Sequence, residues 1–251
     1  MIKTLAGTFA SLFFLCLQAS ASGVPLNVGT YNFPLDGGGG GSQATLGGVP
    51  VEIYCDDFLN EIFVPSSNTA NVTDLDSSTL SNTRFGDVTS WTTISLTGGT
   101  ALELSTLNNA TAAARYDMVA YLISLYNVPQ NSNSSVHTAN NEIQEAIWTL
   151  MDPASYPLPK PLNPDSLDPS TDLEKAADWY NGGGATTAFL SRFEVVSDVN
   201  MTVPSVGVGV GGFQEQIVMT PEPRGVALLL LALLGVCGIM ARRDRSAIEP
   251  L

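Results

Sequence analysis

Histidine, cysteine and positive charge are scarce in this sequence. Its 251 residues include one histidine, three cysteines and 10 Lys and Arg residues against 24 Asp and Glu residues, so the formal net charge is −14. Because duplex binding needs clustered Lys and Arg, we expect no nucleic-acid partner. The motifs G-x-S-x-G and H-E-x-x-H are absent, which removes the common hydrolase and zinc-protease signatures. We expect no cofactor and no metal site.

The N-terminus has the pattern of a secretory signal peptide. A basic start at Lys3 is followed by an apolar run from Leu5 to Leu17 and by small residues that end at Ala21. We expect residues 1–21 to be removed by cleavage after Ala21, and Cys16 to be lost with them. A membrane anchor that is never cut is the alternative, although the apolar run is short for a membrane span.

The C-terminus, residues 221–251, combines a proline-containing triplet, an apolar run and a basic end. The apolar run covers residues 225–241, and its 17 residues are the lower limit for one transmembrane helix. The arginines after it would hold that end on the cytoplasmic side. The segment resembles the PEP-CTERM sorting signal of exosortase-bearing Gram-negative bacteria, and the residues that carry the resemblance, apart from the helix, are Pro221, Glu222, Pro223, Arg242 and Arg243. The resemblance implies processing by an exosortase-like protease, transient anchoring in the inner membrane, and delivery to the cell surface or extracellular matrix.

Only one cysteine remains between the two ends, because Cys237 lies inside the C-terminal apolar run. Residues 22–220 hold 21 acidic and five basic residues, for a net charge of −16. An exported domain in which Cys55 stands alone cannot form an internal disulfide, and an unpaired secreted thiol needs an explanation. Cys55 could be a buried inert residue, part of an intermolecular disulfide, a catalytic nucleophile, or a side chain used in another covalent bond.

The residues around Cys55 favour a buried position. Apolar and polar residues alternate up to Cys55, which predicts a strand with the cysteine on its apolar face. The next residues, Asp56 and Asp57, would raise the pKa of a thiol, which is the wrong direction for a thiolate nucleophile. A Cys55–His137 dyad stays open as the basis of a cysteine hydrolase, but no spacing or local motif favours it.

Apolar periodicity predicts three helices. Those over 111–126 and 138–151 each carry an apolar stripe, and the stripe residues are Met118, Leu122, Leu125, Tyr126, Ile143, Ala146, Ile147 and Leu150. The third helix begins with a capping box from Thr171 to Glu174 and ends at Gly182. Strand-forming residues predict strands over 30–33, 53–64, 91–96, 193–203 and 213–219.

Two motifs in this domain resemble those of the bacterial internal-thioester domain of surface adhesins. One is the pair Tyr54-Cys55, and the other is the helical pattern apolar-Gln-x-Ala-apolar-Trp, formed by Ile143, Gln144, Ala146, Ile147 and Trp148. The resemblance implies a thioester between the Cys55 thiol and the Gln144 side chain, formed with loss of ammonia, with Tyr54, Ala146 and Trp148 in supporting positions. Asp56 after the cysteine and Ile143 before the glutamine depart from the usual residues of the family.

We therefore expect an α+β domain over 22–220, in which a β-sandwich-like part carries Cys55 and a helical subdomain is inserted between its strands. The leading hypothesis is covalent adhesion, in which a Cys55–Gln144 thioester is attacked by an amine or hydroxyl of a surface protein or polysaccharide. This reaction occurs once, so we do not expect an enzyme. The alternatives are a non-covalent structural protein of the exopolysaccharide matrix and a secreted cysteine hydrolase. The acidic surface should favour basic or cation-bridged targets.

Overall fold

The computed structural model describes residues 23–31, 41–58, 65–77, 79–80, 82–96, 99–126, 134–156, 169–200 and 213–219. The predicted signal peptide (1–21) and sorting signal (221–251) lie outside these residues. The predicted transmembrane helix (225–241) is therefore outside them too, as are Pro221, Glu222, Pro223, Arg242 and Arg243. Within the described part of the chain, no helix has the length and apolar character needed to cross a membrane.

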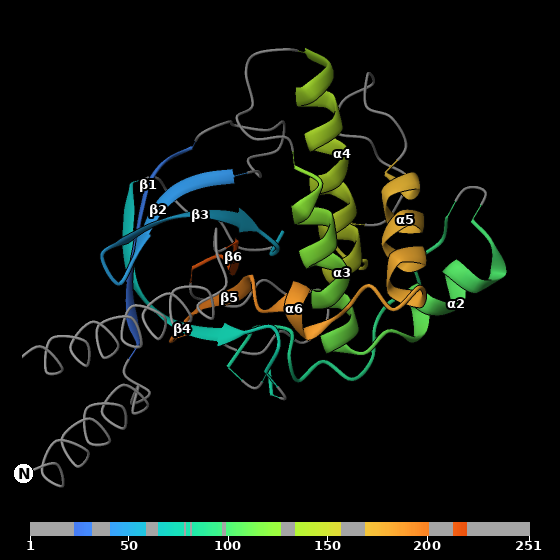
Figure 1. The fold of residues 1–251 in the computed structure, drawn as a ribbon, viewed down its shortest axis with the longest axis horizontal. Coiled ribbons are helices and arrows are strands. Elements are labelled where there is room, and N and C mark those ends of the chain that lie inside the picture. The colour runs from blue at the N-terminus through green and yellow to red at the C-terminus, as the bar shows by residue number, and fades with distance from the viewer. Residues whose placement is uncertain are drawn as a thin grey trace, which may run out of the picture.

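Six antiparallel strands form a closed barrel in the order β1-β2-β3-β6-β5-β4 (Figure 1). They are β1 (Val24–Tyr31), β2 (Gly41–Leu46), β3 (Val49–Cys55), β4 (Ser66–Asp74), β5 (Phe193–Asp198) and β6 (Gln216–Met219). The predicted β-sandwich is wrong. A sandwich has two separate sheets with free edges, whereas here β6 pairs with both β3 and β5 and closes a single sheet.

A two-residue turn joins β2 to β3 and fixes their register. Gly47 and Gly48 both have positive φ, 59° and 83°. Such a pair is typical of the type I′ turn, whose twist matches that of the flanking strands. The turn pairs Leu46 with Val49, and the same register carries the chain to Cys55 at the end of β3.

Side chains on the strands alternate between two cores. Inside the barrel, the buried residues are Leu26, Val28, Ala44, Ile53, Ala70, Val196 and Val218. Their neighbours in sequence face the helices instead, as Tyr54, Val195 and Ile217 do in the second, larger core. The two cores share β3, β5 and β6, so these strands are buried on both faces at the point where Cys55 lies.

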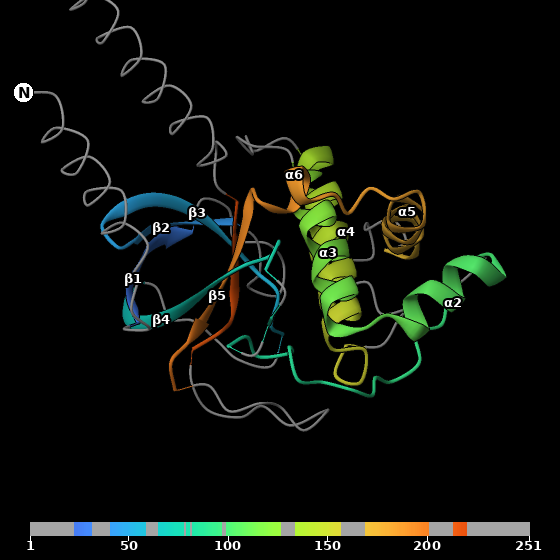
Figure 2. The same ribbon diagram turned by 60° about the horizontal axis from the view of Figure 1, so that its bottom comes forward.

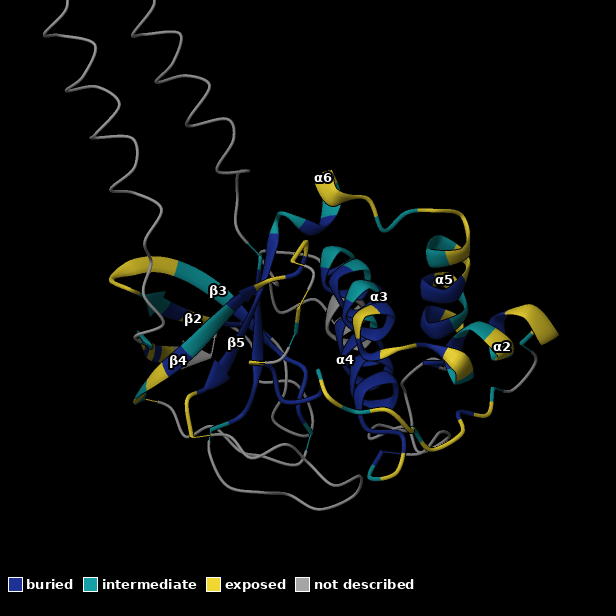
Figure 3. Ribbon diagram, turned by 90° about the horizontal axis from the view of Figure 1, so that it is seen from below, coloured by how far each residue is buried: buried dark blue, intermediate teal, exposed yellow. Residues whose placement is uncertain are grey.

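The helices lie together on one side of the barrel (Figures 1 and 2). They are α2 (Ala101–Asn109), α3 (Ala112–Ser124), α4 (Ser134–Met151), α5 (Ser170–Asn181) and the short α6 (Thr187–Leu190). Figure 3 shows that α3 and α4 are buried over much of their length, whereas α2 is a mixture of exposed, half-buried and buried residues. The barrel and the helices together account for an α+β protein in which β3 and α4 meet.

The periodic helices agree best with the sequence-based predictions. α3 begins after Thr111, whose hydroxyl accepts a hydrogen bond from the Ala114 amide, and α4 ends at Met151 as expected but begins at Ser134. The predicted capping box at Thr171 is wrong, because α5 begins at Ser170 and has no side-chain cap. The capping box lies at Thr100 and Glu103 instead, at the start of the unpredicted α2.

The predicted strands agree less well. Residues 91–96 belong to none of the described strands, and the side chain of Asn108 bonds the backbone of Ile94 there. Its Oδ1 accepts from the Ile94 amide at 2.6 Å, and its Nδ2 donates to the Ile94 carbonyl at 3.0 Å. The strand predicted over 53–64 is wrong at residues 56–58, because β3 ends at Cys55, and residues 59–64 lie outside the described residues.

Candidate functional site

Cys55 lies at the end of β3, opposite Gln216 of β6. Its side chain is 3% exposed, and it is a free cysteine. The strand ends here, and the thiol lies against Trp148 of α4. The expectation that Cys55 is buried is confirmed.

The side chain of Gln144 is held directly against Cys55. Gln144 is on α4 and is 1% exposed, and its Nε2 donates to the Cys55 carbonyl oxygen at 2.7 Å. Its Oε1 accepts from the Tyr126 hydroxyl at 2.9 Å. Both ends of the carboxamide are therefore fixed, and two residues 89 positions apart in sequence are brought together.

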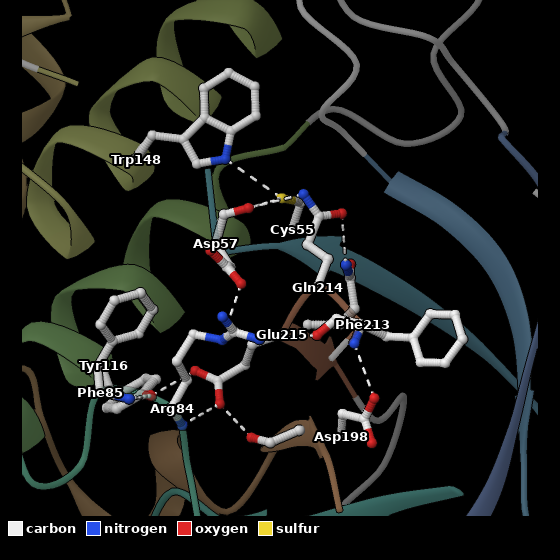
Figure 4. Close-up of polar contacts among 12 residues, drawn as sticks. Cys55, Asp57, Arg84, Phe85, Tyr116, Trp148, Asp198, Phe213, Gln214 and Glu215 are labelled. Atoms are coloured by element: carbon white, nitrogen blue, oxygen red, sulfur yellow. Dashed lines mark hydrogen bonds and ion pairs between the residues drawn. The ribbon is translucent and has the colours of Figure 1, made fainter. Parts of the chain in front are cut away.

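The sulfur of Cys55 has two hydrogen-bond partners. Trp148 is four residues after Gln144 on α4, and its indole Nε1 donates to Sγ at 3.3 Å. The thiol itself donates to the Asp57 carbonyl oxygen at 3.3 Å. Figure 4 shows Trp148 and Asp57 at the sulfur. Because Gln144 and Trp148 lie one helical turn apart on one face, α4 presents both side chains to the same cysteine.

Two other residues of the predicted site, Tyr54 and Ala146, are fully buried in the core between barrel and helices. The ring of Tyr54 packs against the ring of Tyr126, with their centroids 5.0 Å apart and their planes tilted by 46°. Tyr54 therefore contacts the residue that holds the Gln144 carbonyl. Tyr54, Cys55, Gln144 and Trp148 therefore lie at the junction of β3 and α4, and Ala146 is buried on α4.

Three aromatic rings gather around the cysteine. Cys55, Trp148 and Tyr156 form a buried cluster against which Phe58 packs. The ring centroid of Phe58 lies 5.1 Å from that of Trp148 and 4.9 Å from that of Tyr156. The centroids of Trp148 and Tyr156 are 5.5 Å apart. Phe58 and Tyr156 were not predicted, since nothing in their local sequence distinguishes them from ordinary core aromatics.

The thiol of Cys55 is neutral in this environment. Burial raises its pKa well above the ordinary value, and the charge of Asp57 raises it further, although the hydrogen bond from Trp148 acts in the opposite direction. The site therefore does not hold the thiolate that a cysteine hydrolase uses in its resting state. The side chain of His137, the base of the alternative dyad, lies outside the described side chains.

A buried charged network lies next to the site and was not predicted. Arg84 Nε is 2.9 Å from the Asp57 carboxylate, and Arg84 also donates to the Phe213 carbonyl at 3.0 Å. Gln214 Nε2 donates to the Asp57 carbonyl oxygen at 2.8 Å, the same oxygen that accepts from the thiol. The network thus fixes the residue that orients Cys55 (Figure 4).

Glu215 is the centre of the second half of this network. Its carboxylate accepts hydrogen bonds from the Arg84 amide at 2.6 Å, from the Tyr116 hydroxyl at 2.5 Å and from the Ser197 hydroxyl. Asp56, fully buried, lies against the same carboxylate. Burial, followed by the charge of Glu215, raises the pKa of Asp56 well above its ordinary value, so Asp56 keeps a proton that it can donate to Glu215.

In the described part of the chain, Cys55 belongs neither to a metal site nor to the groove on the barrel. Among the described residues, no group of three or more His, Cys, Asp or Glu side chains could hold a metal ion. An open groove of about 680 Å³ lies on the barrel, along β1, β2 and β3, and none of its lining residues belongs to the site around Cys55. The arrangement at Cys55 is a closed site that can support chemistry between a thiol and a carboxamide.

Comparisons with models of protein families, with curated proteins and with solved structures find no match to this chain.

Proposed function

We propose that this protein is an exported bacterial surface or matrix protein that attaches covalently to a partner through a thioester between Cys55 and Gln144. The observation that supports the proposal is the position of the Gln144 carboxamide. Its nitrogen is 2.7 Å from the Cys55 carbonyl oxygen, and both side chains are buried at one point where β3 meets α4. A buried glutamine that is hydrogen-bonded to the backbone of a buried cysteine brings together the two residues that the bond requires.

Formation of the bond joins these two side chains. The Cys55 sulfur attacks the side-chain carbonyl carbon of Gln144, a carbon–sulfur bond forms, and the carbon–nitrogen bond to Nε2 breaks. The thiol proton passes to the nitrogen, which leaves as ammonia. Because the thiol is neutral in the folded protein, the proton that ammonia needs is already at the site.

Attachment to a partner reverses the role of the sulfur. A lysine amine or a glycan hydroxyl attacks the same carbon, its bond to that carbon forms, and the carbon–sulfur bond breaks. The proton of the nucleophile ends on the Cys55 sulfur, which is released as a thiol. The partner is then joined to Gln144 by an amide or an ester, and the site does not turn over, so the protein is not an enzyme.

A stored thioester must be kept from water until the partner arrives. The aromatic cluster of Phe58, Trp148 and Tyr156 supplies an apolar cover beside the sulfur. The Trp148 indole adds a donor aimed at Sγ, which stabilises negative charge on the sulfur when the bond opens. These side chains are suited to a reaction that is suppressed until a nucleophile displaces the cover.

The neutral thiol disfavours the cysteine hydrolase as an alternative. Hydrolases of that class rely on a thiolate paired with a base, whereas burial and the charge of Asp57 raise the pKa of Cys55. A passive buried cysteine in a matrix protein needs no glutamine at its side. The fixed Gln144 carboxamide therefore favours the thioester hypothesis over the cysteine hydrolase and over the non-covalent matrix protein.

The cellular setting belongs to the same proposal. The signal-peptide pattern of residues 1–21 and the PEP-CTERM-like segment 221–251 favour export, transient anchoring in the inner membrane and processing by an exosortase-like protease. The reactive bond would then be presented at the cell surface or in the extracellular matrix of a Gram-negative bacterium. Surface proteins and polysaccharides with accessible amines or hydroxyls are the partners of matching chemistry.

Methylamine tests the proposal as a minimal partner. Treatment of the native full chain should release one thiol, at Cys55, and leave a methylamide on Gln144 that peptide mapping can locate. Gln144→Ala, which keeps the thiol but removes the carboxamide, is the matched control and should give neither product. An untreated chain in which Cys55 is fully alkylated after denaturation, with an intact Gln144 side chain, would show that no thioester forms.

A further inference from the structure

We infer that Tyr126 is a catalytic residue of the thioester site, whose hydroxyl stabilises the negative charge that develops on Oε1 of Gln144 when the bond forms and when it opens. This inference rests on the proposed Cys55–Gln144 thioester. It adds a residue that the sequence motifs do not contain, because Tyr126 lies just beyond the end of α3 and was expected only as part of an apolar stripe.

The position of the hydroxyl carries the inference. It donates to Gln144 Oε1 at 2.9 Å, so a donor already lies at the oxygen on which the negative charge develops. The other end of the carboxamide is held by the Cys55 carbonyl, an acceptor, which cannot stabilise negative charge. The two contacts therefore orient the carboxamide with its oxygen towards the donor.

The hydroxyl is also held in place. The Tyr126 ring is buried and packs against the Tyr54 ring, and the Tyr126 amide donates to the Ile123 carbonyl at 3.1 Å. A donor that is fixed before the reaction loses little to reorganisation when charge develops. Burial, and then the proximity of Cys55, raises the pKa of Tyr126 well above its ordinary value, so the hydroxyl keeps its proton even beside a sulfur anion.

Both reactions of the proposed bond place charge on the same oxygen. When the Cys55 sulfur attacks, the π electrons of the carbonyl move to Oε1 before the carbon–nitrogen bond breaks. When an amine attacks the thioester, they move to Oε1 again before the carbon–sulfur bond breaks. A hydrogen bond to Oε1 strengthens in each of these transition states relative to the neutral carbonyl, which is the condition for catalysis. Trp148, at the sulfur, addresses the leaving group of the second reaction and not the oxygen.

The test compares Tyr126→Phe with Tyr121→Phe, which removes a hydroxyl from the same helix region but from a ring stacked on Trp179. The rate of thiol release by methylamine is measured on each folded full chain, together with the thermal midpoint. Tyr126→Phe should open about 10²- to 10³-fold more slowly, the loss typical of one oxyanion donor, or fail to form the bond at all while remaining folded. Tyr121→Phe should open at the wild-type rate.

A second variant keeps the shape of the ring and changes only the strength of the donor. With 3-fluorotyrosine at position 126 the hydroxyl is more acidic, so thiol release should be faster than in the wild type. An opening rate for Tyr126→Phe within about twofold of the wild-type rate, or slower opening with fluorotyrosine, overturns the role of Tyr126. A wild-type chain with no loss of ammonia refutes the thioester itself, so the two failures are told apart.

Discussion

Arg84→Met should destabilise the protein severely, because it leaves a buried carboxylate without its cation. Arg84 Nε and the Asp57 carboxylate are 2.9 Å apart, and their side chains are only 2% and 1% exposed. Removing one partner of such a pair typically costs about 3–5 kcal/mol, because the remaining charge cannot be solvated. Loss of the hydrogen bond to the Phe213 carbonyl adds to this cost.

A second ion pair on the same chain supplies the control. Lys175 Nζ lies 2.8 Å from Asp172, nearly the same separation, but its side chain is 54% exposed. Lys175→Met should therefore cost at most about 1 kcal/mol, since exposed pairs contribute little. The difference between the two variants shows how much burial adds to the cost of breaking an ion pair of similar N–O separation. Urea denaturation of the full chain gives both free energies of unfolding.

The double variant Arg84→Met with Asp57→Asn separates charge from packing. If the cost comes from an unpaired carboxylate, neutralising Asp57 should recover part of the stability lost in Arg84→Met. A free energy of unfolding for Arg84→Met as close to wild type as that of Lys175→Met would refute the reasoning. So would a double variant less stable than Arg84→Met alone, because the penalty would then come from lost packing.

Two further predictions concern stability. Burial and Glu215 raise the pKa of Asp56 in the folded state. The bound proton therefore stabilises the fold fully below the unfolded pKa of about 3.9. This stabilisation is lost as the pH rises through the folded pKa, at about 1.4 kcal/mol per pH unit. Asp56→Asn, which stays neutral and can still donate, should lose less stability between about pH 5 and about pH 8 in urea titrations; an unchanged slope contradicts this. Gly48→Ala should cost about 1–2 kcal/mol, because φ is 83° there and the added Cβ meets nothing within 4 Å, so the backbone alone is tested. Val49→Ala in the same hairpin, at a 62% exposed position, should change the free energy of unfolding by less than about 0.5 kcal/mol, and an equal effect of both would contradict the assignment.

The helices could be predicted because their apolar stripes are periodic and long. α3 and α4 bury the predicted residues, Met118 and Leu122 on one and Ile147 and Leu150 on the other. The strands could not be predicted to the same extent. β4, with the sequence SSNTANVTD, is mostly small and polar, and its strand identity comes from pairing with β1 and β5.

The closure of the barrel also could not be predicted from the sequence. It depends on β6 pairing with β3 across most of the chain, and such non-local pairing leaves no local pattern. The alternating segments are the same in a sandwich and in a barrel, so the choice between the two is made by which strands become neighbours.

The candidate site likewise contains residues that sequence motifs predict and residues that only the fold brings together. Cys55, Gln144 and Trp148 could be proposed because two short motifs carry them. Tyr126 could not, since its ring fits an apolar stripe and only the fold aims its hydroxyl at Gln144. Arg84 and Glu215 are isolated charged residues in segments without periodicity, and their roles follow from the closure of the barrel around them.

The intact mass of the purified full chain tests the central claim most directly. The mass of the wild type is compared with that of Cys55→Ala after correction for the mass difference of the substitution. Because both chains are processed in the same way, the removal of either end does not affect the comparison. The account predicts that the wild type is lighter by one ammonia and that a peptide linking Cys55 to Gln144 is recovered under mild conditions. Equal masses, with Cys55 freely alkylated in the denatured wild type, would contradict it.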